Sequence, residues 1–352
     1  MKLQQLRNEF AAHNIDAMLV TNPINVSYLS GFTGDDSYIL VTATEAIFFT
    51  DARYTEQVKH ETAGFRIVQR KSTLLEEVVR EVKEAGLQAV GFEKEYVTYA
   101  MYQLFDKYID AQIVGVGGLI EKLRLIKTPE EINIIKVACG IVDDTFEHIL
   151  QFIQPGMTEL QVSNEMEYHM RKLGAKSSSF DTIVASGWRS ALPHGTATDK
   201  IIEKGDIVTL DFGALYNGYI SDTTRTIAVG EPSDQLKEIY DIVLNAQIRG
   251  VEALKPGMTG VEADAVARDY ITKNGYGEAF GHSTGHGIGR EVHEAPALSY
   301  RSSYTLAPGM CVTCEPGIYI PGVGGVRIED DVLITETGHE LLTHAKKDLI
   351  IL

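Results

Sequence analysis

Four acidic residues occupy similar positions in two parts of the sequence. In each part a short β-branched run ends in one acid, a glycine follows closely, and a second acid comes soon after. The four acids are Asp211, Asp222, Glu315 and Glu329. Carboxylates that lie close together repel one another unless a cation neutralises them. If the two parts converge in the fold, the four acids therefore predict a hydrolytic centre with two metal ions.

Histidines surround this set of acids. The glycine-rich stretch Gly281–Gly289 contains His282 and His286, whose spacing matches that of the H-E-x-x-H zinc motif. The glutamate of that motif is missing, and the flanking glycines favour a loop or strand edge over a helix. His293 follows, and His194 lies in a Pro-His-Gly turn. Each histidine could be an ordinary one, but together they could supply a ligand, a proton shuttle and donors to an oxyanion.

The acids and one imidazole indicate which metals the site would accept. Oxygen-rich sites with one imidazole suit Mn²⁺, Co²⁺ or Zn²⁺. Two such ions about 3.5 to 4 Å apart can share a hydroxide and polarise a carbonyl group. Any single acid could instead be a helix cap, a turn residue or half of a surface ion pair. Only the set in related positions favours the metal centre.

An internal repeat relates the two parts. Pro155–Thr158 recurs as Pro256–Thr259, at an offset of 256 − 155 = 101 residues. The second acids of each part, Asp222 and Glu329, differ by 329 − 222 = 107, so short insertions accumulate. The pattern of each copy predicts two helices joined by a Pro-Gly turn, followed by a strand that carries an acid. Two α+β halves with pseudo-twofold symmetry would bring the acids to the middle of one mainly antiparallel, curved sheet.

The residues before this repeat predict a separate α/β domain. Helical patterns cover 3–12 and 74–85, and strand patterns cover 15–20, 38–41, 46–50 and 89–92. Thr128–Glu131 has the form of a capping box with proline at the first helical position, and it predicts a helix that reaches about residue 152. The predicted domains are 1–122 and 123–352.

Composition limits the classes of partner. A chain of 352 residues with 44% hydrophobic and 23% charged residues is typical of a folded protein with two domains. Its net charge of −17 argues against nucleic acid or an anionic membrane as a partner. The charged first residues do not resemble a signal peptide, and no apolar run reaches about 18 residues, so we expect a cytoplasmic protein. Cys311 and Cys314 lie in a strand pattern and are expected in the core, the alternative being a redox or metal role.

The acids and histidine together resemble the metal ligands of the pita-bread metallopeptidases, which include methionine aminopeptidase, aminopeptidase P and prolidase. The matching residues are Asp211, Asp222, His286, Glu315 and Glu329. The motifs Gly-His-Gly-Ile-Gly (285–289), Glu-Pro-Gly-Ile-Tyr (315–319) and Arg-Ile-Glu-Asp (327–330) resemble the proline-specific branch. The region around Asp51–Tyr54 is similar to the creatinase-type domain of that branch, so the resemblance covers essentially the whole chain.

The resemblance implies a role for each member of the ligand set. Asp222 and Glu329 would bridge two divalent ions, Asp211 would complete the site of one ion, and His286 with Glu315 would complete the other. Glu315 would also act as the proton shuttle. Mn²⁺ is the expected metal, with Co²⁺ or Zn²⁺ as alternatives.

The resemblance also implies which residues bind the substrate. His194, His282, His293 and Arg327 match residues that the family places around the bound peptide, and His282 and His293 would take part in catalysis. The expected reaction is hydrolysis of the Xaa-Pro bond in a small peptide with proline at its second position. This bond is a tertiary amide with no N–H and a rigid ring, so a dedicated pocket is chemically sensible.

Several alternatives remain open on sequence alone. The compact length favours an Xaa-Pro dipeptidase (prolidase), and the alternative is an Xaa-Pro aminopeptidase that acts on longer peptides. A creatinase-like amidinohydrolase works without metal, and a non-catalytic peptide-binding relative would need none. Neither class preserves the five ligand positions found in this chain. The family resemblance further implies a homodimer.

Overall fold

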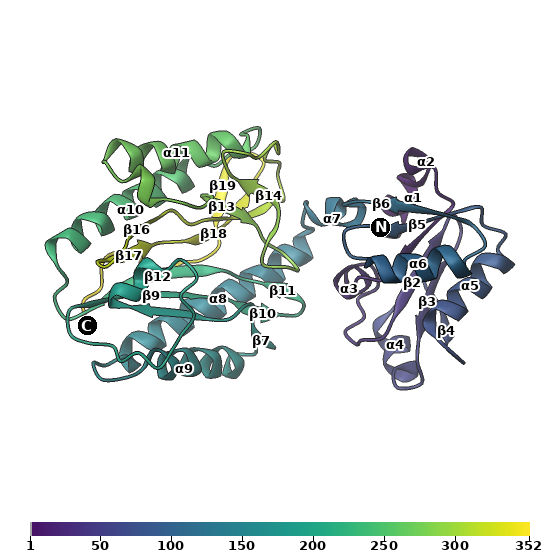
Figure 1. Cartoon of the computed structure of the whole chain (residues 1–352), viewed down its shortest axis with the longest axis horizontal. Helices are drawn as coiled ribbons and strands as arrows, with labels where there is room; N and C mark the ends of the chain where they lie inside the picture. Colours follow the sequence, from purple (N-terminus) through teal and green to yellow (C-terminus); the bar gives the residue numbers. More distant parts are fainter. Residues whose placement is uncertain (1) are drawn as a thin grey trace. The chain divides into compact units, whose positions relative to one another are not determined.

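The structure is a computed structural model that describes residues 2–352; Met1, the first residue of the predicted domain 1–122, lies outside them. The chain divides into two compact units (Figure 1). Unit 1 ends at Arg124, and unit 2 comprises Leu125–Leu352. Within the described residues, no helix is long and apolar enough to cross a membrane.

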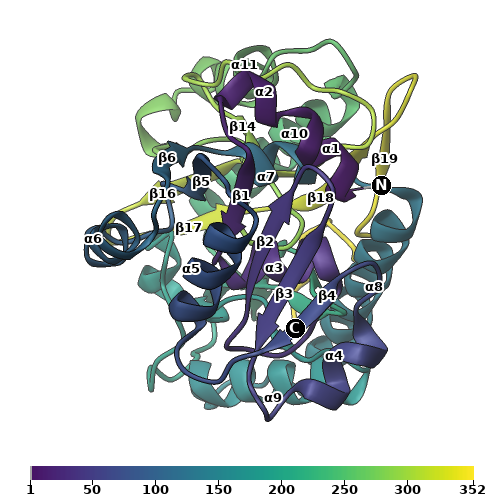
Figure 2. The same ribbon diagram turned by 90° about the vertical axis from the view of Figure 1, so that its right-hand side faces the viewer.

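Unit 1 contains a six-stranded mixed sheet (Figure 2). Its strands are β1 (Ala17–Val20), β2 (Tyr38–Thr42), β3 (Ala46–Thr50), β4 (Arg66–Gln69), β5 (Ala89–Glu93) and β6 (Gln112–Val116), in the order β4-β3-β2-β1-β5-β6. Its helices are α1 (Lys2–Asn8), α2 (Phe10–His13), α3 (Pro23–Ser30), α4 (Thr55–Glu61), α5 (Leu74–Glu84), α6 (Tyr99–Tyr108) and α7 (Leu119–Arg124). The predicted α/β fold of this region is confirmed.

Helices cover both faces of this sheet. On β1, Leu19 packs in a core with residues of α5 and α6, whereas Met18 and Val20 pack with residues of α1, α2, α3, α4 and α7. Successive strand residues point to opposite faces, so a strand that is covered on both sides must be apolar throughout. The helical pattern predicted over 3–12 corresponds to α1 and α2, which are interrupted only at Glu9.

Unit 2 consists of two pairs of long helices and antiparallel strands. The helices are α8 (Pro129–Phe152), α9 (Glu159–Lys172), α10 (Asp234–Ala253) and α11 (Gly260–Lys273), with short 3-10 helices η1 (Gly187–Ala191) and η2 (Gly277–Ala279). The strands are β7 (Ser177–Ser178), β8 (Ile183–Ser186), β9 (Asp206–Phe212), β10 (Ala214–Tyr216), β11 (Tyr219–Ile220), β12 (Thr223–Val229), β13 (Gly285–Gly287), β14 (Glu294–Leu298), β15 (Cys311–Cys314), β16 (Gly317–Ile320), β17 (Gly324–Arg327), β18 (Asp330–Ile334) and β19 (His339–Leu341).

The helix pairs enclose the strands. Figure 1 shows α10 and α11 on one side of the strands and α8 and α9 on the other. Residues of α8 and α9 form a core with β8, β9 and β12, and residues of α10 and α11 form cores with β15, β16, β17 and β18. The strand order is β12-β9-β8 in the first half and β14-β13-β15-β18-β19 in the second, with all pairs antiparallel. The predicted duplicated α+β fold is therefore confirmed.

The repeated tetrapeptide has a structural cause. Its threonines, Thr158 and Thr259, are the N-caps of α9 and α11, and each forms a capping box. The preceding glycines, Gly156 and Gly257, have φ of +95° and +85°. Only glycine adopts these values without strain, so the turn and the helix start require the same residues twice.

The alternation of the acid-bearing strands is as predicted. Val208 and Leu210 of β9 pack against α8 and α9, so Asp211 points to the opposite face. In the second half, Val312 and Cys314 of β15 pack in a core with α10 and α11. Each acid-bearing strand thus packs its apolar side against a helix pair and directs its polar side away from those helices. The three cysteines are buried and form no disulfide among the described residues.

Candidate metal centre

Strand pairing brings the four acids to the middle of unit 2. β9 pairs with β12, which places Asp211 opposite Thr224, and Asp222 immediately precedes β12. β15 pairs with β18; Glu315 follows the first of these strands and Glu329 precedes the second. Each half therefore contributes two acids from the ends of neighbouring strands.

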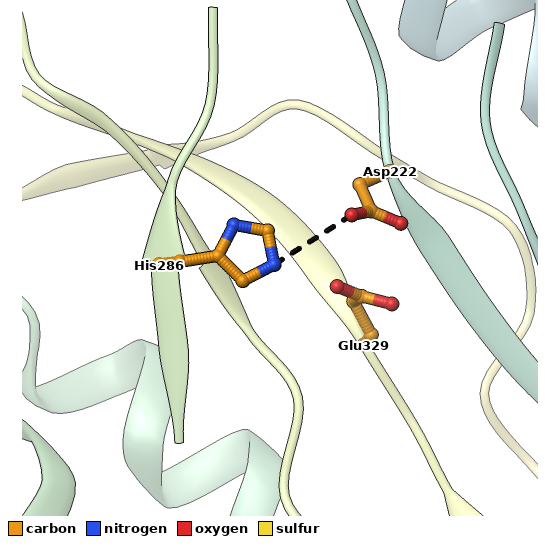
Figure 3. Close-up of side chains that lie close together, drawn as sticks. All are labelled: Asp222, His286 and Glu329. Atoms are coloured by element: carbon orange, nitrogen blue, oxygen red, sulfur yellow. Dashed lines mark ion pairs between the residues drawn. The ribbon is translucent and has the colours of Figure 1, made fainter. Parts of the chain in front are cut away.

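Three of the predicted residues form one compact cluster. Asp222, His286 and Glu329 each offer a ligand atom, and these atoms all lie within 4.8 Å of one another. Figure 3 shows the imidazole and both carboxylates pointing toward one another from three separate segments. The Nε2 atom of His286 is 3.7 Å from Oδ2 of Asp222 and 3.3 Å from Oε1 of Glu315. The cluster thus extends to a fourth predicted residue.

Asp211 is held by a buried arginine. Arg327 donates from Nη2 to Oδ2 of Asp211 at 2.5 Å, from Nη1 to the hydroxyl of Tyr319 at 2.6 Å, and from Nε to Oγ1 of Thr224 at 3.1 Å. Burial raises the pKa of Asp211, although the Arg327 charge opposes this. Tyr319 and Thr224 were not predicted as site residues. Tyr319 ends the Glu-Pro-Gly-Ile-Tyr motif, which was the available signal, whereas nothing in the sequence pointed to Thr224.

Unsatisfied oxygens test whether the site suits a metal. Oδ1 of Asp211 and Oδ1 of Asp222 are buried and have no hydrogen-bond partner within residues 2–352. Such a group costs on the order of 1–3 kcal/mol, and more when it is charged. A divalent cation would give both oxygens a partner, and carboxylates with an imidazole are ligands that Mn²⁺, Co²⁺ and Zn²⁺ accept. The residues present therefore fit a metal centre.

The electrostatics agree with this fit. Burial and the nearby Glu329 charge raise the pKa of Asp222, and burial and the Glu315 charge raise the pKa of Glu329. Burial acts in the same direction on Glu315, but the hydrogen bond and charge of His286 lower its pKa to about 2. Without a cation, the site thus holds the ion pairs of His286 with Glu315 and of Arg327 with Asp211, beside two carboxyl groups, Asp222 and Glu329, whose pKa values are raised. A cation would remove this penalty.

A cavity of about 610 Å³ lies over the cluster, which is within the usual size range for small-ligand sites. All the predicted site residues line it: Asp211, Asp222, His286, Glu315, Glu329, His194, His282, His293 and Arg327. Apolar side chains complete part of the wall, among them Phe180, Pro193 and Val292. The cavity therefore combines an acidic cluster with apolar surface.

His282 is held by hydrogen bonds at both ring nitrogens. Nδ1 lies 2.8 Å from the carbonyl of Ser283, which can only accept, so Nδ1 carries a proton. Nε2 then accepts from the hydroxyl of Tyr319 at 2.9 Å. Burial lowers the pKa of His282, which favours this neutral form. His282 can bond a substrate only by exchanging one of these partners.

His293 and His194 are less constrained. The His293 ring centre is 4.5 Å from that of His286, and burial lowers the pKa of His293. His194 lies on an exposed part of the cavity wall. Neither ring has a hydrogen-bond partner elsewhere in the described chain, so both have nitrogens available for a ligand.

Comparisons with known proteins give a consistent result. Residues 133–336 match the model of metallopeptidase family M24, and residues 2–126 match that of the creatinase/prolidase N-terminal domain. An Xaa-Pro dipeptidase of Pyrococcus furiosus is 43% identical over 351 residues, which cover 99% of each chain.

Solved structures are also similar over nearly the full length. The Xaa-Pro dipeptidase from Bacillus anthracis superimposes with a TM-score of 0.98 at 58% identity, covering 100% of this chain and 99% of the other. The X-Pro aminopeptidase from Thermotoga maritima superimposes with a TM-score of 0.92 at 41% identity, covering 98% of this chain and all of the other.

Proposed function

Because the chain belongs to metallopeptidase family M24 and has a creatinase/prolidase N-terminal domain, we propose that it hydrolyses the Xaa-Pro bond of dipeptides. The observation that carries this proposal is the cluster of Asp222, His286 and Glu329, with ligand atoms within 4.8 Å, in a cavity with an apolar wall. The relatives named Xaa-Pro dipeptidase support the same substrate class. The predicted domain 123–352 would carry the catalytic centre and 1–122 the creatinase-like part.

The proposed ligand set comprises all five acidic and imidazole groups. Asp222 and Glu329 would be shared by two divalent cations, Asp211 would complete one site, and His286 and Glu315 the other. Mn²⁺ is the expected metal, and Co²⁺ or Zn²⁺ are alternatives because an oxygen-rich site binds several divalent ions. When bound, such ions activate a water molecule and polarise the scissile carbonyl.

The remaining cavity residues would act on the substrate and its protons. Glu315, beside His286 on the cavity wall, is the proposed carrier of the proton from the attacking water to the leaving nitrogen. His293 has free ring nitrogens and is the proposed donor to the carbonyl oxygen of the scissile bond. His282 is expected to act nearby after exchanging a partner, and His194 and Arg327 to orient the peptide.

An apolar wall explains why proline would be accepted. The leaving nitrogen of an Xaa-Pro bond carries no hydrogen, so the pocket needs no acceptor for it. The rings of Phe180 and Pro193 and the side chain of Val292 line the cavity and offer surface for the pyrrolidine ring. Burying that ring removes apolar area from water, at about 25 cal/mol per Å².

An Xaa-Pro aminopeptidase is the second candidate, favoured by the similarity to the Thermotoga maritima structure. The creatinase-like amidinohydrolase and the non-catalytic relative are not favoured, because neither needs the ligand set present in this cavity. A cytoplasmic location and a homodimer are part of the proposal and rest on the sequence and the family resemblance alone.

The test is release of the first amino acid by metal-stripped protein reconstituted with Mn²⁺, Co²⁺ or Zn²⁺. The substrates are Ala-Pro, Ala-Pro-Ala and, as a control without proline, Ala-Ala. Cleavage of Ala-Pro alone supports the dipeptidase, and comparable cleavage of Ala-Pro-Ala supports the aminopeptidase. Metal binding without cleavage of either proline peptide would overturn the proposed specificity.

A further inference from the structure

Glu159 and Asp264 are among the buried carboxylates of unit 2 that lie outside the metal centre and the cavity wall. Glu159 is the first residue of α9 and is 0% exposed, and Asp264 of α11 is 1% exposed. Burying a charge is costly unless partners compensate it. Each carboxylate pairs with one arginine, Arg189 for Glu159 and Arg268 for Asp264. The remaining side-chain partners of both carboxylates lie at the end of β8 and in loops that lead to the cavity.

Asp264 and Arg268 fix the loop that carries His282. Arg268 donates from Nε to Oδ2 of Asp264 at 2.6 Å and from Nη2 to Oδ1 at 2.8 Å. The same guanidinium donates to the carbonyls of Phe280 at 3.0 Å and His282 at 2.7 Å. Oδ1 of Asp264 also accepts from the backbone nitrogen and the hydroxyl of Thr284, at 3.0 and 2.9 Å. The backbone is thus held before, at and after His282.

This attachment continues toward the metal centre. The carbonyl of Thr284 accepts from the backbone nitrogen of Glu315 at 2.7 Å. The ring of Phe280 packs edge-on against the His282 ring, with centres 5.0 Å apart, and the Arg268 guanidinium lies over Phe280 at 4.3 Å. The position of the His282 ring therefore depends on the helix α11 through one ion pair.

Glu159 acts in the same manner on the loop that carries His194. Oε1 accepts from the backbone nitrogen and hydroxyl of Ser186 at 2.8 and 2.9 Å, and Oε2 accepts from those of Thr198 at 3.1 and 2.9 Å. Arg189 donates to Oε2 and, at 2.9 Å, to the carbonyl of Thr196. Glu159 thus ties together the two ends of the segment around His194 without bonding that residue.

We propose that Asp264 and Glu159 are positioning residues, which set the places of His282 and His194 in the cavity through Arg268 and Arg189. The inference rests on the proposed function, because it assumes that these histidines face the substrate. A displacement of about 1 Å in such a group can cost about 100-fold in rate. The carboxylates therefore control catalysis without touching the metal or the peptide.

The first test compares Asp264→Asn with Asp269→Asn, which changes the same charge at an exposed position of the same helix. An amide in place of the carboxylate cannot accept both Arg268 bonds. We expect kcat/KM for Ala-Pro to fall about 10- to 100-fold in Asp264→Asn, with unchanged Mn²⁺ stoichiometry and affinity by calorimetry. Asp269→Asn should match the unmodified protein.

Arg268→Lys supplies a second variant, which keeps the charge but not the planar fork that reaches Asp264 and both carbonyls. It should show the same loss as Asp264→Asn, and a fully active Arg268→Lys protein would contradict the inference. This variant decides the question if Asp264→Asn does not fold.

A spectroscopic readout separates positioning from general weakening. In protein with ¹³C-labelled histidine and diamagnetic Zn²⁺, the His282 ring signal is assigned by its absence in His282→Gln. It should shift or broaden in Asp264→Asn, while the His293 signal stays in place. An unchanged His282 signal together with unchanged kcat/KM overturns the inference.

The matched experiment in the first half compares Glu159→Gln with Glu167→Gln, a residue of the same helix whose side chain is 42% exposed. Because Glu159 holds only the ends of the His194 segment, we expect a smaller loss, about 3- to 10-fold, mainly as a higher KM. Equal activity of the two variants overturns this half of the inference. Failure of the unmodified, metal-loaded protein to cleave Ala-Pro would overturn the proposed function instead, and the ring signals would still test the positioning.

Discussion

The two halves of unit 2 contribute equivalent acids from different local structures. In the first half, β9 and β12 pair over seven residues, and Asp211 and Asp222 lie at the same end of this ribbon. In the second half, β15 and β18 pair over four residues, and the hairpin of β16 and β17, which pairs over four residues, separates Glu315 from Glu329. The equivalent hairpin between Asp211 and Asp222, formed by β10 and β11, pairs over only two residues. The segment between the two acids spans 222 − 211 = 11 residues in the first half and 329 − 315 = 14 in the second, which accounts for half of the increase in offset from 101 to 107. Duplication has kept the positions of the acids but not their surroundings.

Each half also holds the acid that the other contributes. The backbone nitrogen of Asp222 donates to Oδ2 of Asp331 at 2.8 Å, and Oε2 of Glu329 accepts from the hydroxyl of Thr224 at 2.6 Å. The Glu329 carboxylate thus has a protein donor, whereas Oδ1 of Asp222 has none among the described residues. Neither half could therefore form the cluster alone, and the two acids differ in how firmly they are fixed.

The largest effect is expected from removing either shared acid. Asp222→Ala and Glu329→Ala should each lower kcat for Ala-Pro by at least about 10³-fold, because each is proposed to serve both ions. Metal content by mass spectrometry should fall in both. Near-normal turnover of either variant would contradict the assignment. A loss of metal in only one variant would show that the two halves do not contribute equally to metal binding.

A buried arginine links the halves and should dominate stability. Arg225 of the first half donates to the carbonyl of Glu329, to Oδ1 of Asp330 at 2.6 Å, and to the carbonyl of Ala345 near the end of the chain. Arg225→Met would leave these buried groups short of a partner, so the free energy of unfolding should fall by about 3–5 kcal/mol. Chemical denaturation measures this change.

The control for Arg225→Met is Arg171→Met. Arg171 pairs with Glu167 on the surface of α9, at 3.0 Å, with side chains 52% and 42% exposed. Such a pair contributes about 0–1 kcal/mol. Similar losses in the two variants would show that Arg225 does not hold the halves together.

A smaller effect, on rate alone, is expected at His293. His293→Ala should keep both metals but lower kcat by about 10²- to 10³-fold, the usual cost of removing one donor to a developing oxyanion. Steady-state kinetics with parallel metal analysis checks this. Loss of metal in this variant would instead place His293 among the ligands and call the role of His286 into question.

The sequence predicted those features that local patterns determine. The capping box at Thr128 predicted the start of α8, and the repeated tetrapeptide predicted the two matching helix pairs, because both depend on residues close in sequence. Edge strands such as β4 were missed because their side chains are largely exposed and show little apolar pattern. The break in the first helix had no signal either.

The sequence predicted the acidic residues of the site, but not the residues that hold them and the neighbouring loops by hydrogen bonds. Duplicated acids stand out in a sequence, and the structure brings all four to one cavity, although their roles as ligands stay predictions. Thr224, Asp331 and Asp264 escaped notice, since a threonine or acid acquires such a role only when a distant segment comes within hydrogen-bond distance. Tertiary pairing, not local sequence, selects these residues.

Thr224 offers the finest test of how the halves differ. Thr224→Val keeps the shape of the side chain but removes the donor to Glu329 and the acceptor for Nε of Arg327. Loss of a hydrogen bond to a ligand typically lowers metal affinity about 10- to 100-fold, and we expect this for Mn²⁺ by calorimetry. Asp222 is hydrogen-bonded to Asp331 and not to Thr224, so the variant should still bind Mn²⁺, with the lower affinity.

The matched control is Thr209→Val on the neighbouring strand. The Thr209 hydroxyl is buried and has no hydrogen-bond partner among the described residues, so its removal loses no bond and should leave metal affinity and stability unchanged or slightly improved. A fall in affinity for both variants would mean that the hydroxyls on this face do not act through Glu329. A fall for Thr224→Val alone would show that the first half fixes the shared acid of the second.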